Sequence, residues 1–175
     1  MKIKITTLLL FFVSTFLFAQ EDWKTFAKDN FSIQYPATWE YSDQKPQPNI
    51  QFVLMSEEAS QNEDMFRENI NLNTEDLNGQ DVSLKDYAKA GLDQVFAQIP
   101  SAKMITNNDI KLGGENAKEI IWSANLGNGI LLKFKQVFLL KDGTAYVLTF
   151  TATETDYDKY IVDGEKILYS FKFTN

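Results

Sequence analysis

Apolar and polar residues alternate along most of this chain with the period of β-strands. In residues 30–36, Phe31, Ile33 and Tyr35 alternate with polar residues, which is typical of a strand with one buried face. The same kind of pattern predicts further strands at 23–27, 39–41, 50–55, 65–72, 103–112, 116–125, 130–140 and 144–152. Strands therefore account for most of the regular structure that the sequence predicts.

Two other segments repeat apolar residues every three or four positions, which is the period of an amphipathic helix. The first begins after Ser83, a favourable N-cap, and runs to Ile99, where Pro100 ends it. The second follows Thr155, which we expect to be its N-cap. The apolar stripes are Leu84, Tyr87, Ala88, Gly91, Leu92, Val95, Phe96 and Ile99 in the first helix, and Tyr157, Tyr160, Ile161, Gly164, Ile167, Leu168 and Phe171 in the second.

Glycine-containing turns separate the last four predicted strands, which indicates an antiparallel meander. The Asp142-Gly143 pair is a strong hairpin signal, because both central residues of such a turn need a positive φ. In residues 131–140 and 145–152 apolar residues occupy both faces, so both sides of the sheet must be covered. The pattern therefore predicts an α+β fold, an α/β/α sandwich with a central, mainly antiparallel sheet flanked by two amphipathic helices.

The N-terminal segment has the layout of a secretory signal peptide. Lys2 and Lys4 precede a largely apolar run over residues 5–18, and Ala19 follows as the small residue at a cleavage site. The run is shorter than the roughly 20 apolar residues of a spanning helix, although an uncleaved anchor is the alternative. We expect a signal peptide at 1–19 and a single domain at 20–175, which is periplasmic or secreted and has no transmembrane segment.

Composition narrows the possible chemistry further. Cleavage would remove two lysines and no acidic residue, changing the net charge from −7 to −9, and such a chain repels nucleic acid and anionic lipid. There is no histidine and no cysteine, so the usual nucleophilic triads, disulfides and most zinc sites are excluded. The lack of cysteine in an exported chain favours a bacterial protein, and no cofactor is expected.

Four segments resemble the PsbP-like superfamily, in the same order along the chain. They are residues 30–39 (NFSIQYPATW), 66–72 (FRENINL), 142–150 (DGTAYVLTF) and 170–173 (SFKF). The predicted leader makes the chain most similar to the bacterial exported branch of that superfamily. The resemblance implies an α/β/α sandwich and an accessory or binding role, and it implies no shared catalytic activity. The metal binding linked to the photosynthetic branch is not carried over, because no metal-site motif matches here.

Paired carboxylates are the remaining route to catalysis, because two of them can hydrolyse a glycoside. The candidates are Glu115 with Glu119 on one strand, or Glu68 with a distant partner. Alternation places Glu68 on the same face as Phe66 and Ile70, where burial would raise the pKa of its carboxyl. The alternative is that these carboxylates pair with lysine or arginine. A calcium loop at 76–81 fails, because its glycine is misplaced and the twelfth position has no glutamate.

A row of polar residues along one predicted strand indicates a surface for a partner or a ligand. Asparagine is a poor strand residue, so Arg67, Asn69, Asn71 and Asn73 on one face suggest a face left open. Trp39 and Tyr41 are expected nearby, because such aromatics anchor interfaces. The alternative is a solvated sheet face, with Trp39 in the core.

These observations predict an exported, non-catalytic accessory or binding protein. Its partner would be another envelope protein or a small ligand, and not nucleic acid. Two other functions stay open, a carboxylate-based hydrolase acting on glycans and a structural role in the cell envelope. A cleft with two facing carboxylates would favour the hydrolase, and an open polar sheet face would favour binding.

Overall fold

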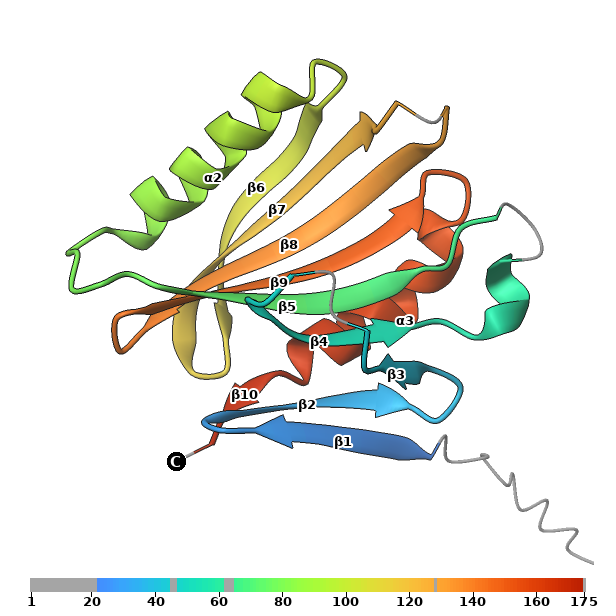
Figure 1. The fold of residues 1–175 in the computed structure, drawn as a ribbon, viewed down its shortest axis with the longest axis horizontal. Helices are drawn as coiled ribbons and strands as arrows, with labels where there is room; N and C mark the ends of the chain where they lie inside the picture. Colours follow the sequence, from blue (N-terminus) through green and yellow to red (C-terminus); the bar gives the residue numbers. More distant parts are fainter. Residues whose placement is uncertain (1–21, 45–46, 62–64, 128, 175) are drawn as a thin grey trace, which may run out of the picture.

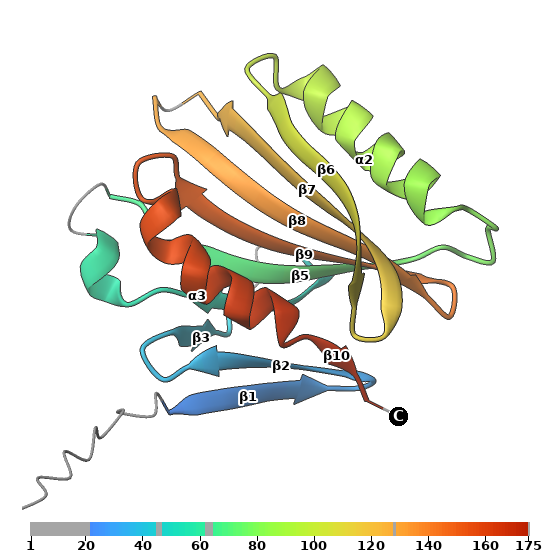
Figure 2. The same cartoon turned by 180° about the vertical axis from the view of Figure 1, so that it is seen from behind.

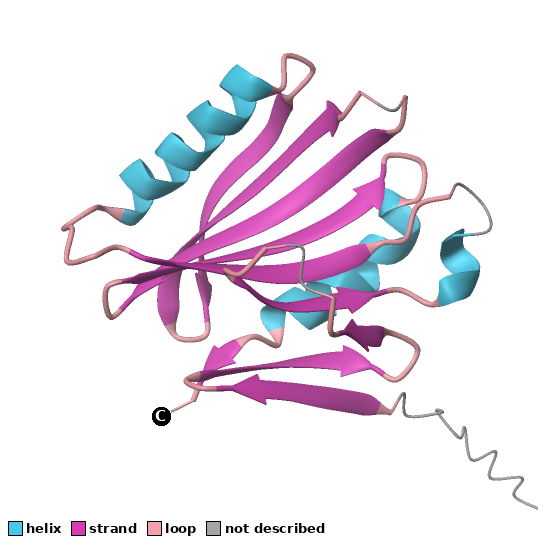
Figure 3. Ribbon diagram, viewed as in Figure 1, coloured by secondary structure: helices cyan, strands magenta, loops and turns pink. Residues whose placement is uncertain are grey.

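The computed structural model describes residues 22–44, 47–61, 65–127 and 129–174, and the predicted signal peptide lies outside them. Strands and helices follow one another as shown in Figures 1 and 3. The strands are β1 (Trp23–Lys28), β2 (Phe31–Pro36), β3 (Glu40–Ser42), β4 (Ile50–Met55), β5 (Asn69–Asp76), β6 (Lys103–Leu112), β7 (Glu115–Asn125), β8 (Leu131–Lys141), β9 (Thr144–Thr153) and β10 (Lys172–Phe173). The helices are the short 3-10 helix η1 (Glu58–Ser60), α2 (Leu84–Gln98) and α3 (Tyr157–Tyr169).

The main sheet has seven strands in the order β3-β4-β5-β9-β8-β7-β6, and a second sheet has three in the order β1-β2-β10. Neighbouring strands in both sheets pair antiparallel. The predicted meander over the last four long strands is confirmed. Asp142 and Gly143 have φ of 50° and 74°, so the hairpin between β8 and β9 has the predicted geometry.

The second sheet is a finding that strand periodicity did not indicate. Lys172 and Phe173 of β10 pair with Ser32 and Phe31 of β2, although these residues stand at opposite ends of the described chain. Figure 2 shows this sheet beside α3, on the same side of the main sheet. The fold is therefore the predicted α+β arrangement, with α2 on one face and α3 plus a small sheet on the other.

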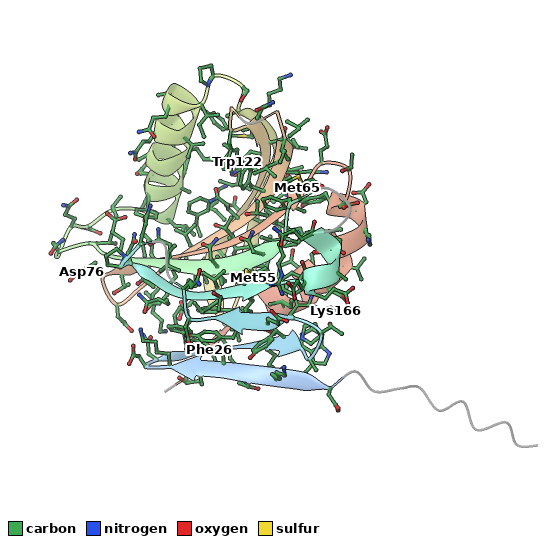
Figure 4. All side chains as sticks on the ribbon, turned by 45° about the vertical axis from the view of Figure 1, so that its right-hand side comes forward. Phe26, Met55, Met65, Asp76, Trp122 and Lys166 are labelled. Carbon is green, nitrogen blue, oxygen red and sulfur yellow. The ribbon has the colours of Figure 1, made fainter. Side chains whose placement is uncertain are left out.

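Each face of the main sheet has its own hydrophobic cluster. On the α2 side, Ala88 and Leu92 pack against β7 and β8, where Ile120, Trp122 and Phe134 are buried. The larger cluster lies on the α3 side and joins β2, β4, β5, β8 and β9 to the helix. Figure 4 labels Trp122 in the space between α2 and the sheet, and Phe26 at the small sheet. The Phe26 ring packs against Tyr41 and Phe52 of the main sheet.

The caps explain where the helices begin. Ser83 Oγ accepts a hydrogen bond from the Asp86 amide at 3.1 Å and donates one to the Asp86 carboxylate at 2.7 Å, so Ser83 is the N-cap that the sequence predicts. The N-cap of α3 is Asp156 rather than Thr155, and its side chain makes no capping bond. The Asp156 amide instead donates to Thr153 Oγ1 at 3.3 Å, so the end of β9 stabilises this helix start.

The predicted strand 65–72 is shifted in the structure, where β5 covers Asn69–Asp76. Met65 has a φ of 63°, which breaks the extended backbone before the strand begins. Phe66 packs against the cluster on the α2 side, whereas Ile70 and Leu72 are buried on the α3 side. The prediction that Phe66 and Ile70 share a face is therefore wrong, because the regular alternation starts only at Asn69.

Candidate functional site

Three asparagines form a row along one side of β5. Asn69, Asn71 and Asn73 are half-buried and alternate with Ile70 and Leu72, which are fully buried on the other side. We call these three residues the asparagine row. Since alternate residues of a strand point to opposite faces, the row lies on the face opposite the larger core.

The asparagine row faces the same side as α2. Asn71 stands opposite Thr149 of β9, which stands opposite Gln136 of β8, which stands opposite Ile120 of β7. Directly opposed residues share a face, and Ile120 packs in the cluster under α2. The row therefore occupies the part of the α2 face that lies beyond the helix.

One helix is too narrow to cover this face. Strands lie about 4.8 Å apart and a helix is about 10 Å wide, so α2 covers roughly two strands of the sheet. The helix contacts β7 and β8, which leaves β9, β5, β4 and β3 on one flank and β6 on the other. In Figure 1, α2 lies at the end of the sheet that contains β6, β7 and β8. Strands β5 and β4 lie at the other end, beyond β9.

A pocket of about 360 Å³ lies on the β5 flank of α2. Both polar and apolar side chains line it, and they come from one wall of helix α2 and from a floor of sheet strands. We call it the α2–β5 pocket, and it is lined by Tyr87, Ala90, Gly91, Gln94 and Val95 of the helix and by Glu75, Gln136, Phe138 and Val147 of the sheet. Asn73 stands opposite Val147 and two residues before Glu75, so the asparagine row continues the pocket floor.

Hydrogen bonds fix several polar groups of this pocket. Trp122 Nε1 donates to Gln136 Oε1 at 2.8 Å, and Gln136 Nε2 donates to Thr149 Oγ1 at 3.1 Å. The Tyr87 hydroxyl donates to Glu75 Oε2 at 2.7 Å. Burial raises the pKa of Tyr87 well above its usual value, and the hydrogen bond to the Glu75 carboxylate raises it further, so the phenol stays neutral.

The asparagine row differs from these fixed groups. Asn69 Nδ2 donates to the Arg67 carbonyl at 3.0 Å. Within the part of the chain that the structure describes, the side-chain amides of Asn71 and Asn73 make no hydrogen bond to protein. Each amide offers two donors and an acceptor, so these two side chains can bond to a ligand or a partner without breaking an internal contact.

Arg67 lies beside the row but is already engaged. Its Nε donates to the Ser56 carbonyl at 2.6 Å, and its Nη2 forms an ion pair with Glu40 Oε2 at 2.6 Å. Only 16% of the Arg67 side chain is exposed. Arg67 therefore anchors the loop before β5 to β3 and the end of β4, and borders the candidate surface.

Trp39 and Tyr41 lie on the other side of the main sheet. Trp39 is 3% exposed and belongs to the larger core cluster. Tyr41 stands opposite Leu54 and stacks on Phe26 at 5.2 Å between ring centroids. The six residues predicted for one surface thus separate into four on the α2 side and two on the α3 side. The alternative interpretation of Trp39 as a core residue is confirmed.

Each candidate carboxylate already has an ion-pair or hydrogen-bond partner within the protein. Glu115 pairs with Lys141 at 2.5 Å and Glu119 with Lys135 at 3.1 Å. Glu68 is fully buried, and its Oε2 accepts a hydrogen bond from Ser56 Oγ at 3.1 Å. The described residues do not place Glu115 and Glu119 across a cleft, since each faces its own lysine. This arrangement matches the ion-pair alternative given by the sequence.

Glu119 belongs to a buried ionic cluster under α3. Lys135 also pairs with Glu165 at 2.5 Å, and the Tyr169 hydroxyl donates to Glu119. Burial lowers the pKa of Lys135, but hydrogen bonds to Glu165, Tyr169 and Glu119 outweigh that effect and leave it raised. Lys135 therefore stays charged, and the cluster ties α3 to β7 and β8.

The geometry of the described residues favours neither a metal site nor a membrane-spanning helix. Among the described residues, no three acidic side chains gather closely enough to hold a metal ion. In the same part of the chain, no helix has both the length and the apolar character to cross a bilayer. The pocket, the asparagine row and the fixed polar groups around them lie on the face of the antiparallel sheet that one helix covers only in part.

The sequence assigns this chain to a known family. The profile of the PsbP-like protein family matches residues 14–173, so the chain belongs to that family. Among curated protein sequences, none matches this chain.

Solved structures with the same fold come from distant organisms. Cyanobacterial PsbP (CyanoP) from Synechocystis has 14% identity and a TM-score of 0.66, with 91% of this chain and 97% of that chain covered. LpqN of Mycobacterium tuberculosis, described as involved in cell envelope biogenesis, has 14% identity and a TM-score of 0.58, covering 89% and 92%. The Ran-binding protein Mog1p of Saccharomyces cerevisiae has 8% identity and a TM-score of 0.59, covering 89% and 97%. At these identities the likeness shows the fold alone.

Proposed function

We propose that this protein is a non-catalytic accessory or binding protein of the bacterial cell envelope. Its binding site is the α2–β5 pocket together with the asparagine row. The partner is another envelope protein or a small ligand that bonds to side-chain amides over a partly apolar floor.

One observation carries this proposal. Asn71 and Asn73 lie on a sheet face that α2 leaves uncovered, and their amides make no bond to the described protein. Half-buried asparagines in the middle of a sheet are unfavourable for the fold. A role in binding explains why this strand has amides where the other side of the same strand has isoleucine and leucine.

The remaining features support a binding role over a hydrolytic one. Glu115 and Glu119 are neutralised by separate lysines, whereas a glycosidase needs two carboxylates flanking one bond. LpqN is described by its part in cell envelope biogenesis and Mog1p by its binding of Ran, so the fold serves roles of this kind elsewhere.

The envelope location rests on the predicted leader at 1–19. Lys2, Lys4 and the apolar run before Ala19 match the layout of a signal peptide. Mass spectrometry of the protein purified from its own cells checks this, and the expected N-terminus is Gln20. An N-terminus at Met1 in the purified protein would contradict cleavage after Ala19 and would favour the uncleaved anchor.

Photo-crosslinking tests the site itself. A photoreactive amino acid at Asn73 is expected to crosslink a partner or ligand in living cells, whereas the same amino acid at Thr25 is not. Thr25 is an exposed residue of β1 in the small sheet, far from the asparagine row, so it reports non-specific capture. Combining Asn71→Ala with the photoreactive amino acid at position 73 should reduce the crosslinking yield, because the Asn71 amide can no longer bond to the partner. Equal crosslinking from Asn73 and Thr25 would refute the proposed site.

A further inference from the structure

Strand β6 is a long edge of the main sheet. It has ten residues and, among the described strands, pairs with β7 alone, whereas the opposite edge strand β3 has three residues. Most residues of β6 are exposed. An edge strand presents unpaired backbone N–H and C=O groups, which can accept a further strand from another chain.

A bulge divides β6 into two parts. The register with β7 shifts between Met104 and Thr106, which leaves Ile105 as the extra residue, and Ile105 is 50% exposed. From Thr106 to Leu112 the pairing with β7 is regular. An added strand therefore has a regular stretch of about seven residues to pair with, and the bulge limits it at one end.

An apolar pocket opens beside this edge, on the other flank of α2 from the α2–β5 pocket. We call it the β6 pocket, and its volume is about 330 Å³. Its walls are Ala88, Leu92 and Phe96 of the helix, and Met104 and Asn107 of β6. Met104 stands opposite Trp122 and Asn107 opposite Ile120, so these two side chains share the face on which α2 packs.

The surroundings of the β6 pocket are basic, although the whole chain carries a net charge of −7. Three lysines and one aspartate line the pocket, and β6 itself adds two lysines and one aspartate. These residues are Lys85, Lys89, Lys118 and Asp93 at the pocket, and Lys103, Lys111 and Asp109 on β6. Both aspartates are already paired, with Lys89 and Lys118 respectively. Lys85, Lys103 and Lys111 have no acidic partner in the described ranges.

We propose that β6 binds an extended, acidic segment of another protein as an added strand. Backbone hydrogen bonds form along Thr106–Leu112, and one apolar side chain of the segment enters the β6 pocket against Leu92 and Phe96. Acidic side chains of the segment pair with Lys85 and Lys111. In this mode the backbone bonds provide affinity, and the pocket with its lysines selects the sequence.

Charge favours such a segment over a second copy of this chain. Pairing of β6 with β6 of another copy would bring Lys103 and Lys111 of both copies to one seam, with only Asp109 from each to balance them. The net charge of −7 on each copy adds to the repulsion. The inference does not rest on the α2–β5 pocket, because α2 separates the two surfaces.

A designed peptide tests the proposal on the mature protein. The probe has the sequence Glu-Thr-Leu-Thr-Glu-Thr-Glu with blocked ends, which places the leucine and the glutamates on one face of a strand. Amide chemical shifts in a titration followed by NMR are expected to move along β6 and along the flank of α2 that faces it. A peptide with lysine in place of each glutamate, and one with serine in place of leucine, are expected to bind at least about tenfold more weakly.

Matched protein variants separate charge from fold. The double variant Lys85→Glu/Lys111→Glu is expected to weaken binding of the acidic peptide at least about tenfold. The control Lys24→Glu/Lys159→Glu changes the same charge at exposed positions of β1 and α3, and should leave the affinity unchanged. Asn73→Ala in the asparagine row should also leave it unchanged, which distinguishes this site from the proposed function.

Three results would overturn the proposal. One is the absence of saturable shifts on β6 at about 1 mM acidic peptide. Another is an equal loss of affinity in the charge-reversal variant and its control. The third is concentration-dependent dimerisation through β6, measured by sedimentation without peptide. That result would show that a second copy of this chain binds the β6 edge.

Discussion

Alanine substitutions at two helical glycines should change stability in opposite directions. Gly164 lies in α3 and Gly91 in α2. A Cβ on Gly164 would lie 3.0, 3.1 and 3.2 Å from three ring atoms of Phe150, whereas a Cβ on Gly91 would lie 3.9 Å from Phe138 Cε1. A methyl group therefore overlaps a buried ring at Gly164 and makes an ordinary van der Waals contact at Gly91.

The magnitudes follow from two competing terms. Replacing glycine by alanine inside a helix favours the helix by about 0.8–1.0 kcal/mol, and this gain is the same at both positions. Overpacking a core costs about 1–3 kcal/mol, and Phe150 is 0% exposed, so its ring has little room to move. Gly164→Ala should therefore lose up to about 2 kcal/mol of the free energy of unfolding, while Gly91→Ala should gain up to about 1 kcal/mol.

Urea unfolding followed by tryptophan fluorescence measures both variants, with the m-value as the check that the same surface is exposed. In a domain of this size, a change of about 1 kcal/mol moves the melting temperature by about 2–4 °C. The shared helix propensity cancels in the comparison, so the difference between the variants reports the contact with Phe150. If Gly164→Ala stabilised the protein as much as Gly91→Ala, the close approach of α3 to β9 would be wrong.

Three further perturbations have clear expected outcomes. Gly143→Val should destabilise the domain by about 1–3 kcal/mol, because Gly143 has a φ of 74° and a β-branched residue disfavours that conformation; an unchanged melting temperature would contradict the turn. Burial raises the pKa of Tyr157 from 10.0 to about 12, and the charge of Lys135 opposes this shift. The stability that depends on a neutral Tyr157 hydroxyl is therefore complete below pH 10 and is lost as the pH rises toward 12. Tyr157→Phe should remove that part of the alkaline loss and should not lower stability at pH 7, because the buried hydroxyl has no hydrogen-bond partner among the described residues; unfolding curves at pH 7 and pH 11 check both. Arg67→Ala should cost about 1–3 kcal/mol through its two hydrogen bonds, whereas Asn71→Ala should change stability by less than about 0.5 kcal/mol, and thermal melts of the two variants compare them.

Local patterns predicted much of the fold because they report local constraints. Ser83 and Pro100 bound α2, and the Asp142-Gly143 turn sets the register of β8 and β9. The pairing of β10 with β2 was not predictable in this way, since Phe173 and Phe31 meet only after the chain has closed around the core. Periodicity describes one strand at a time, and the division into two sheets depends on contacts between distant segments.

The candidate site was partly predictable for the same reason. The asparagine row follows from alternation along β5, so its three residues were grouped correctly on one face. Trp39 was grouped with them by its residue type, but it precedes β3 and lies in the core on the other side. The partners of Glu119 were also not predictable, because Lys135 reaches it from a neighbouring strand and Tyr169 reaches it from α3.

The two faces of the main sheet explain why the two proposed binding surfaces lie where they do. On the α3 side, Ile70, Leu148 and Phe150 are 0% exposed, because α3 and the small sheet pack over the strands that carry them. On the α2 side a single helix stands over β7 and β8 and leaves a flank on each side. A flank that no helix covers cannot keep large apolar residues without exposing them to water, so it takes side chains that water or a partner can satisfy. The asparagine row on one flank and the lysines around β6 on the other both follow from this incomplete cover of the α2 side. A further helix over each flank of α2 would have removed both surfaces.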